Sequence, residues 1–561
     1  MIERIVLFAL NNRTAVLFFS LVVAVAGLTA FRGLTIEAFP DPTDTQVNVI
    51  TLFSGQPTEE VERQIGLPIE RALNGTPGLM RLRNLSLFGL SYVTLTFEDG
   101  VDALFARSQV LERLRDAELP EGIVPQLGPL ATPIGEVYRY TLIGAGGNPM
   151  RLRTLQDWVV RPRLLRVAGV ADVVSYGGLV REVQVQPSPA KLASFGLTLE
   201  DLETALNNAS TNASGGVLER GAEQLVIRSQ GLFRSLDDIA SVHITTNEGT
   251  PVHVHDVASV RDGWSPRQGV VSRGMHFDAV EGIVLMRRGE NPSMVLQRVR
   301  DAVRELNERI LTDGVRVEPF YDRTELVNTT LRTVGKNLLE GAMLVVLVLF
   351  VFLLDLRAAL IVAALIPLSL LSAFIYLKLR GMSANLLSMG AVDFGIIVDG
   401  AVVIVESIVS RLSEAHEREL PAEVLQARIR LSVNDVARPT VFALLIIIAA
   451  YLPIFLLERV EGRIFAPMAN TVVAALIGAL TFSITLVPVL AAVVYRRPIR
   501  HRQSPLLRWA QHAYTPTLRW AMDHSWTVVL SSLAALGIAL FVLSNQGSEF
   551  LPELNEGSLY L

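Results

Sequence analysis

The stretch Gly381–Leu412 reads GMSANLLSMGAVDFGIIVDGAVVIVESIVSRL, an apolar run interrupted by three acids, Asp393, Asp399 and Glu406. About 20 apolar residues are enough to cross the hydrocarbon core of a bilayer as a helix. Each charge near the middle of a membrane costs roughly 2.5–3.5 kcal/mol on insertion scales. Three acids on one spanning helix therefore indicate either a function or compensating partners.

The spacing of these acids predicts a proton relay. On a helix with about 100° per residue, Asp399 and Glu406 lie within about 20° of one face and about 10 Å apart along the axis. Asp393 lies about a third of a turn away from that face. Carboxylates gathered in a low-dielectric environment can bind and release protons near neutral pH. Gly395 and Gly400, beside the acids, would let a neighbouring helix approach closely.

The alternative interpretation is that the acids only pair with basic residues on other helices. No Lys or Arg stands in the middle of the other apolar segments, so a static partner would have to come from outside this chain. We therefore favour the relay.

Composition supports a membrane protein, because half of the 561 residues are hydrophobic and only 19% are charged, below the usual share of about 25%. The apolar residues are concentrated in blocks. Seven segments are expected to span the bilayer: Thr14–Phe31, Leu338–Leu354, Ala358–Leu377, Ala384–Val409, Pro439–Leu457, Ile464–Tyr495 and Ser525–Ser544. The first lacks a small-residue cleavage site and is expected to be an uncleaved anchor.

The positive-inside rule orients these spans. The stretch Arg496–Asp523 carries six arginines against one acid, so it is expected to be cytoplasmic. Counting helices backwards makes the N-terminus cytoplasmic and places the long segment Arg32–Lys336 outside. Within the basic stretch, LLRWAQHAYTPTLRWAMDH reads as an amphipathic helix lying on the membrane surface.

The external segment contains a faint internal repeat. The first copy runs from the strand TQVNVITLF through the helix TEEVERQIGLPIERALNG to PGLMRLRNLSLFG and the strand SYVTLTFE. The second runs from VYRYTLIG through RLRTLQDWVVRPRLLRV to AGVADVVSYGG and the strand REVQVQPS. Each continues into another helix, VDALFARSQVLERLRDA or TLEDLETALNN. This order predicts two ferredoxin-like domains, so the fold class is an α-helical membrane domain with α+β external subdomains.

Several functions are disfavoured. A net charge of −5 gives no reason to expect nucleic acid as a partner, and the absence of cysteine removes disulfides and thiolate metal sites. No nucleophile elbow, phosphate loop or HExxH motif is present, and GAGGNP at Gly144 lacks the context of a dinucleotide-binding loop. The chain is therefore not expected to be an enzyme or to carry a resident cofactor.

The motif DFGIIVDGAVVIVE, Asp393 to Glu406, resembles the fourth-helix signature of the resistance-nodulation-division transporters, in their heavy-metal efflux branch of the cobalt–zinc–cadmium type. Supporting runs are YDRTELV, IPLSLL, ARPTVFALLIIIAAYLPIF, PMANTVV and GSEFLPELNEGSL. One departure is Ser407, where the family motif usually has Asn after the glutamate.

The resemblance implies a homotrimeric, multi-pass pump of the inner membrane with a large periplasmic segment, working with a periplasmic adaptor protein and an outer-membrane channel. Asp393, Asp399 and Glu406 match the acids that carry protons, whereas the family's lysine on a later helix would lie beyond this chain. The chain is expected to supply the first seven spans and the first external segment. The expected layout is a first helix over residues 1–32, porter and docking subdomains over 33–335, spans two to six over 336–500, a cytoplasmic amphipathic loop over 501–524, span seven over 525–546 and the start of a second periplasmic segment over 547–561.

The resemblance also narrows the substrate. Multidrug members usually carry two adjacent aspartates in this helix, and copper and silver members typically lack the first aspartate and use methionines. Asp393 is present and the external segment is poor in methionine, so zinc, cobalt, cadmium or nickel is the expected cargo, exchanged for protons. Two alternatives stay open: a multidrug or amphiphile exporter on the same scaffold, and an inactive fragment lacking the second half.

Candidate metal ligands lie in the external segment. Glu136 and Asp172 occupy corresponding places at the entry of the second repeat, and zinc-type members have acids near both places; the alternative is that both are ordinary solvated acids. His253 and His255 would fall on one strand face as a two-point metal site, or form a polar edge. His276 is a weaker candidate of the same kind.

Overall fold

The computed structural model describes residues 2–34, 36–37, 41–212, 214–221, 223–247, 250–267, 269–274, 278–385, 389, 394–413, 421–495 and 505–547. The chain divides into two compact units. The first comprises Met1–Thr132, Asn291–Ser293 and Arg323–Leu561, and the second comprises Pro133–Glu290 and Met294–Asp322.

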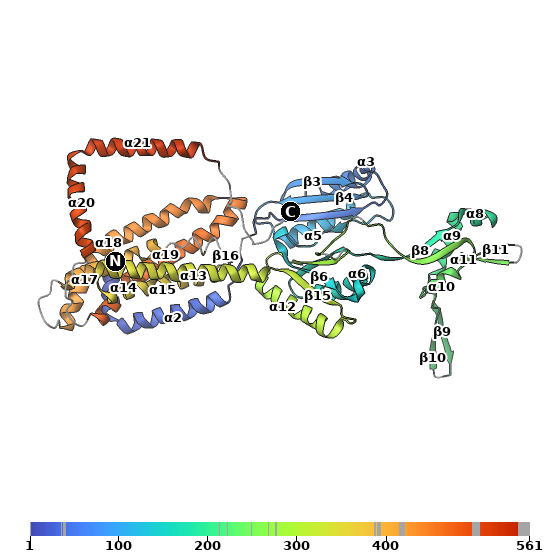
Figure 1. Cartoon of the computed structure of the whole chain (residues 1–561), viewed down its shortest axis with the longest axis horizontal. Helices are drawn as coiled ribbons and strands as arrows, with labels where there is room; N and C mark the ends of the chain where they lie inside the picture. Colours follow the sequence, from blue (N-terminus) through green and yellow to red (C-terminus); the bar gives the residue numbers. More distant parts are fainter. Residues whose placement is uncertain are drawn as a thin grey trace. The chain divides into compact units, whose positions relative to one another are not determined.

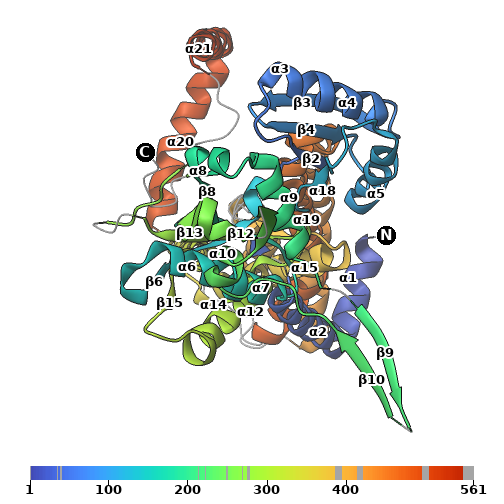
Figure 2. The same ribbon diagram turned by 90° about the vertical axis from the view of Figure 1, so that its right-hand side faces the viewer.

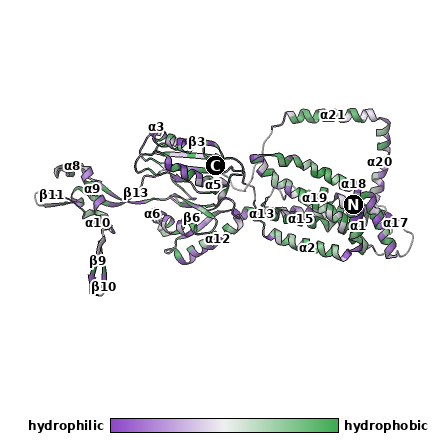
Figure 3. Cartoon of the chain, turned by 180° about the vertical axis from the view of Figure 1, so that it is seen from behind, coloured by the Kyte–Doolittle hydropathy of each residue, from purple (hydrophilic) through white to green (hydrophobic). Residues whose placement is uncertain are grey.

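Apolar helices dominate the first unit, several of them running alongside one another (Figure 1). Colouring by hydropathy shows hydrophobic residues concentrated along these helices (Figure 3). Their bounds are α1 Ile2–Asn11, α2 Arg13–Arg32, α13 Arg323–Leu353, α14 Leu356–Ala363, α15 Leu365–Leu379, α17 Phe394–Ser413, α18 Ala422–Tyr451, η7 Leu452–Leu456, α19 Arg459–Val494, α20 Pro505–Asp523 and α21 Ser525–Ser544.

Six helices among the described residues are long and apolar enough to cross a membrane; they begin at Arg13, Arg323, Leu356, Glu423, Arg459 and Ser525. They coincide with six of the seven expected segments, and α21 matches its expected range to the residue. The seventh, α17, carries three charged side chains, which lowers its hydropathy. The number of spans therefore stays a prediction.

The acidic helix begins later than expected. Ala384 and Asn385 form a short strand, β16, that pairs in parallel with β1, Ile36–Glu37. Among the described residues, α17 covers Phe394–Ser413. The basic stretch after α19 is helical over Pro505–Asp523, as expected for an amphipathic segment, although most of its arginines lie outside the described residues.

The first unit also contains a four-stranded antiparallel sheet with the strand order β3-β4-β2-β5. This is the ferredoxin-like order predicted from the first repeat. Apolar residues of β2, β4 and the helices, among them Val49, Ile69, Val93 and Val110, form its core. The bounds are β2 Gln46–Leu52, α3 Thr58–Val61, η1 Glu62–Gly66, α4 Leu67–Leu73, β3 Leu79–Leu87, β4 Leu90–Phe97, α5 Ala103–Arg113, η2 Leu114–Asp116 and β5 Gln126–Leu127.

The second unit repeats this fold with the strand order β15-β6-β14-β7. Helices pack on one face of the sheet, where Tyr140, Val284, Leu164 and Leu296 belong to one buried cluster. The bounds are η3 Pro133–Gly135, β6 Glu136–Ile143, η4 Ala145–Gly147, α6 Pro149–Leu155, η5 Gln156–Val160, α7 Arg161–Leu165, β7 Val170–Gly177, β14 Val280–Met286, α12 Pro292–Glu305, η6 Leu306–Ile310 and β15 Arg316–Asp322.

One part of the repeat prediction is wrong. The strand REVQVQPS is not the third strand of the second ferredoxin-like domain, because β8, Arg181–Pro187, pairs with β13, Ala258–Trp264. The third strand is β14, about a hundred residues further along the chain. The helix TLEDLETALNN likewise belongs to the insertion between β7 and β14.

The insertion is a small α+β region of its own. It includes a β9–β10 ribbon whose strand residues are all exposed and which projects as a separate arm (Figure 2). The remaining bounds are α8 Pro189–Ser194, α9 Leu199–Ala209, β9 Ser214–Arg220, β10 Glu223–Arg228, α10 Leu236–Ala240, β11 His243–Asn247, β12 Thr250–His253 and α11 Val254–Val257.

Candidate functional site

Helix α17 has two contrasting faces. One is buried in the apolar core of the bundle through residues spaced three and four apart, which include Val398, Ala401, Val405, Ile408 and Leu412. That spacing places them on one side of an α-helix. The other side carries Asp399 and Glu406, both of which are exposed in this chain.

The two acids are therefore together on one stripe, as predicted, whereas Asp393 lies outside the described residues. Within the part of the chain that the structure describes, neither Asp399 nor Glu406 forms an ion pair or a side-chain hydrogen bond.

Helices α18 and α19 approach α17 closely at Gly400. A Cβ added there would lie 2.9 Å from Cγ2 of Thr440, 3.2 Å from Cδ1 of Leu444 and 3.8 Å from Oγ of Ser483. The expectation that Gly400 allows close helix packing is thus met at the position beside Asp399. The Ser483 hydroxyl is buried and has no hydrogen-bond partner among the described residues.

Ser407, the departure from the family motif, joins α17 to α18. Its hydroxyl donates a hydrogen bond of 3.1 Å to the backbone carbonyl of Ser432. One helical turn further on, Arg411 forms an ion pair of 2.7 Å with Asp435. These two contacts hold α17 and α18 in a fixed register on the C-terminal side of Glu406.

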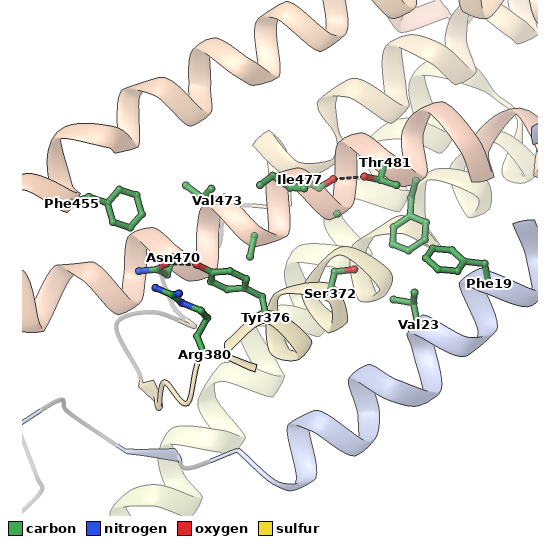
Figure 4. Close-up of a pocket in the computed structure, with 13 residues that line it drawn as sticks. Phe19, Val23, Ser372, Tyr376, Arg380, Phe455, Asn470, Val473, Ile477 and Thr481 are labelled. Carbon is green, nitrogen blue, oxygen red and sulfur yellow. Dashed lines mark hydrogen bonds between the residues drawn. The ribbon is translucent and has the colours of Figure 1, made fainter. Parts of the chain in front are cut away.

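A groove of about 560 Å³ lies between α2, α15 and α19, and its lining residues include no acid (Figure 4). Phe19, Val23 and Ile477 give it apolar walls. The Tyr376 hydroxyl donates a hydrogen bond of 2.9 Å to Oδ1 of Asn470. The groove is therefore a separate feature from the acidic stripe of α17.

In the second unit, Glu136 and Asp172 lie in one row of the sheet. Each is the register partner of Leu285 on the central strand β14, Glu136 from β6 and Asp172 from β7. Residues directly opposite one another in antiparallel strands point to the same face, with neighbouring strands about 4.8 Å apart. The two acids thus face the same side, about 10 Å apart at the backbone.

Both acids are held by arginines. Glu136 forms an ion pair with Arg139, and Oδ1 of Asp172 accepts hydrogen bonds from Arg161 at 3.0 Å and from the backbone N–H of Val173 at 2.7 Å. Their side chains are about a third and a quarter exposed. A cation arriving at this row would therefore compete with guanidinium groups for the carboxylate oxygens.

The sequence prediction missed a third acid on this face, Glu281. Its register partners are Thr141 and Tyr176, four positions along β14 from Leu285, so it points to the same side as Glu136 and Asp172. Burial raises the pKa of the Glu281 carboxyl, the Arg139 guanidinium opposes this, and the Glu136 carboxylate adds to it. A raised pKa beside other acids is a recognised signal of a functional site, but only strand register reveals it.

The histidine prediction is partly wrong. His253 ends the strand β12, but His255 lies in the helical turn α11, so the two do not share a strand face. Their rings are nevertheless stacked, with centroids 5.3 Å apart. His276 lies outside the described residues.

An apolar helical bundle with an acidic helix, combined with two ferredoxin-like domains, is the fold expected for the resistance-nodulation-division class. The chain belongs to the AcrB/AcrD/AcrF family, whose profile matches residues 5–561. It is 41% identical over 573 residues to the cation efflux system protein CzcA of Alcaligenes sp. strain CT14, covering all of this chain and 54% of that protein. It is also 41% identical to the cobalt-zinc-cadmium resistance protein CzcA of Cupriavidus metallidurans, again over 54% of its length.

The fold agrees with solved structures of a relative. A crystal structure of a heavy metal efflux pump superposes with a TM-score of 0.86 at 39% identity, covering 99% of this chain and 53% of the pump. The predicted membership of the family and resemblance to its heavy-metal branch are confirmed. The chain spans about half the length of the curated relatives that it matches.

We expect Gly400→Ala to lower the thermal stability of the bundle, because the added methyl group would overlap Thr440. Overpacking of this kind typically destabilises by about 1–3 kcal/mol. Gly537→Ala is the matched control, since a Cβ at Gly537 in α21 meets nothing within 4 Å. The melting temperatures of both variants in detergent check this; equal values would contradict the close approach.

Glu281→Gln should stabilise the protein in a pH-dependent way. Because the folded-state pKa of Glu281 is raised, the folded chain binds more protons than the unfolded chain above about pH 4.3, and stability falls as pH rises through that region. Because a Gln side chain does not ionise, the variant does not lose stability as the pH rises. We expect a higher melting temperature than wild type at pH 8 and an equal one at pH 4; an equal gain at both would refute the assignment.

Proposed function

We propose that this chain forms part of a proton-driven exporter of divalent heavy-metal cations, with zinc, cobalt, cadmium or nickel as cargo. The observation that carries the proposal is the stripe of α17 on which Asp399 and Glu406 stand without a partner among the described residues, while the opposite face is buried. The names of the relatives, which include cobalt-zinc-cadmium resistance, support the choice of cargo.

The proton part of the proposal follows from the energetics of the acidic stripe. An ionised carboxylate in the hydrocarbon region is expensive unless it is paired or neutralised by a proton. Asp399 and Glu406 are two turns apart, about 10 Å along the axis, so water or a further side chain would connect them. Protonation of each would gain about 2.3 kcal/mol per charge from every 100 mV of membrane potential traversed. Asp393 is proposed as the third member of the relay.

The proposed metal site lies on the face of the second unit's four-stranded sheet that points away from the packed helices; this is called the open face. Glu136 and Asp172 would be ligands, and Glu281 lies on the same face four residues further along β14, where it would add negative charge near the row. A divalent cation can displace Arg139 and Arg161 from these carboxylates because it carries twice the charge of a guanidinium. Carboxylate oxygens suit borderline divalent ions better than copper(I) or silver(I), which prefer sulfur.

The proposed setting is the inner membrane, with residues 33–335 in the periplasm as porter and docking subdomains. A trimer with a periplasmic adaptor and an outer-membrane channel is the assembly we propose. The exposed β9–β10 ribbon and the fully exposed helix α21 are consistent with surfaces that other chains, other segments or lipid cover.

Asp399→Asn should abolish proton-coupled transport while the protein still inserts. The test is metal-dependent collapse of a pH gradient in proteoliposomes that contain this chain joined to the C-terminal half of a family pump. Zinc, cobalt, nickel, cadmium, copper(I) and one dye serve as substrates. Glu340→Gln is the control, since Glu340 lies on α13 and pairs with Lys336 at 3.7 Å. Gradient collapse that survives Asp399→Asn would remove the relay.

Glu136→Gln combined with Asp172→Asn should raise the metal concentration needed for half-maximal transport on the order of tenfold or more, the effect typical of disturbing a metal site. The maximal rate and the response to protons should change little. Measurement uses the same vesicles. If only the dye collapses the gradient in the unsubstituted protein, a multidrug exporter replaces the metal pump.

A further inference from the structure

A cluster of metal-ligating side chains lies in the insertion of the second unit, away from the open face that carries Glu136 and Asp172. His253, His255 and Asp256 each offer one ligand atom, and these atoms all lie within 4.8 Å of one another. We propose that this cluster is a binding site for a borderline divalent cation such as Zn²⁺ or Co²⁺. The chemistry of these three side chains is enough to define the class of cation, so this proposal does not depend on the proposed transport function.

The separations are close to those that a metal requires. With metal–nitrogen distances of about 2.0–2.1 Å, a tetrahedral ion sets its ligand atoms roughly 3.3 Å apart. Nε2 of His255 lies 3.4 Å from Oδ1 of Asp256. Nδ1 of His253 lies 3.9 Å from Oδ2 of the same carboxylate. The three ligand atoms lie within 4.8 Å of one another, so the His253 ring would have to rotate out of its stack with His255 to bring all three to the separation that a metal requires.

The hydrogen bonds around the cluster leave Nε2 of His255 and Oδ1 of Asp256 available, whereas the His253 side chain also takes part in a capping box with Asp256 at the start of α11. Nδ1 of His255 lies 2.9 Å from the backbone carbonyl of Ala240, so that nitrogen carries the proton and Nε2 presents its lone pair. A metal-ligating histidine usually has its second ring nitrogen held in this way. Oδ2 of Asp256 accepts a hydrogen bond of 2.8 Å from the backbone N–H of His253, which leaves Oδ1 facing His255.

The backbone that carries these ligands is anchored. Val252, Val254 and Val257 alternate with the ligands along the chain and are 2% exposed or less. They belong to the apolar core of the insertion. The ligands themselves are between about a third and just over a half exposed, so an ion can reach them from solvent.

The choice of cation follows from the donor set. Two imidazoles and one carboxylate, with water in a fourth position, is a set typical of Zn²⁺ and accepted by Co²⁺ and Ni²⁺. Mg²⁺ and Ca²⁺ prefer oxygen ligands alone. His243, the cross-strand partner of His253, places a further ring edge-on at a centroid distance of 6.0 Å. A bound ion would therefore join β12 to α11, next to the β11 strand.

The test is metal binding by the whole purified chain in detergent, carrying an affinity tag without histidine. Zn²⁺ binding is measured by calorimetry, and Co²⁺ binding by its visible d–d absorption, in wild type, in His255→Gln and in His253→Ala/His255→Ala. We expect the double variant to bind one ion fewer per chain and to lose the tetrahedral Co²⁺ bands. His255→Gln should bind at least tenfold more weakly, since outer-shell losses alone reach that size.

His512→Ala is the control. Its Nδ1 also contacts a backbone carbonyl, at 2.9 Å, but it lies in α20, outside any described group of three ligands. Unchanged stoichiometry and affinity in His255→Gln, with the melting temperature retained, would overturn the proposal. An equal loss in His512→Ala would also overturn it. The binding experiment in detergent uses no pH gradient. A failure to bind metal at this cluster would therefore say nothing against the proton relay, and a failure of the relay would say nothing against this site.

Discussion

The membrane part of this protein is organised by the difficulty of keeping a carboxylate in hydrocarbon. Helix α17 meets this constraint by dividing its surface. Val398, Ala401 and Val405 join the apolar core, while Asp399 and Glu406 share the stripe that this chain leaves uncovered. The close packing at Gly400 against Thr440 and Leu444 keeps the helix from turning the acids inward. The two acids are thereby held on a face where no described residue pairs with them.

The two ferredoxin-like domains show how one fold can be used twice with different results. Both sheets have the same antiparallel order, with the first and third strands central. In the first domain the strands β3 and β4 are joined by a tight connection, whereas in the second the equivalent strands β7 and β14 are separated by the insertion. This enlarges the second domain without disturbing its core, because a strand pair tolerates a long connection at its end at small entropic cost.

Much of this arrangement was predictable, because it depends on local pattern. Hydropathy located α21 to the residue, and alternation identified the strands of the first ferredoxin-like domain. The pattern failed where pairing is nonlocal. REVQVQPS alternates like any half-buried strand, and nothing in it distinguishes β13 from β14 as its neighbour. Glu281 was missed for the same reason, since its place beside Glu136 depends on register between strands far apart in sequence. The short helix α1, Ile2–Asn11, was not predicted, because its ten residues are too few to be recognised as a membrane-spanning segment.

Helix α19 contacts both the acidic helix α17 and the first ferredoxin-like domain. Its 36 residues extend about 54 Å, well beyond the roughly 30 Å of a hydrocarbon core, and it packs against α17. At its start, Arg463 donates to the backbone carbonyl of Thr43 at 2.6 Å, and it pairs with Asp44 at 3.2 Å and with Asp99. A guanidinium fork that engages several acceptors fixes direction as well as distance. This fork joins the start of α19, ahead of its internal Pro467 and Pro488, to the segments that lead into β2 and α5. Arg463 therefore links α19, which packs against the acidic helix, to the first ferredoxin-like domain.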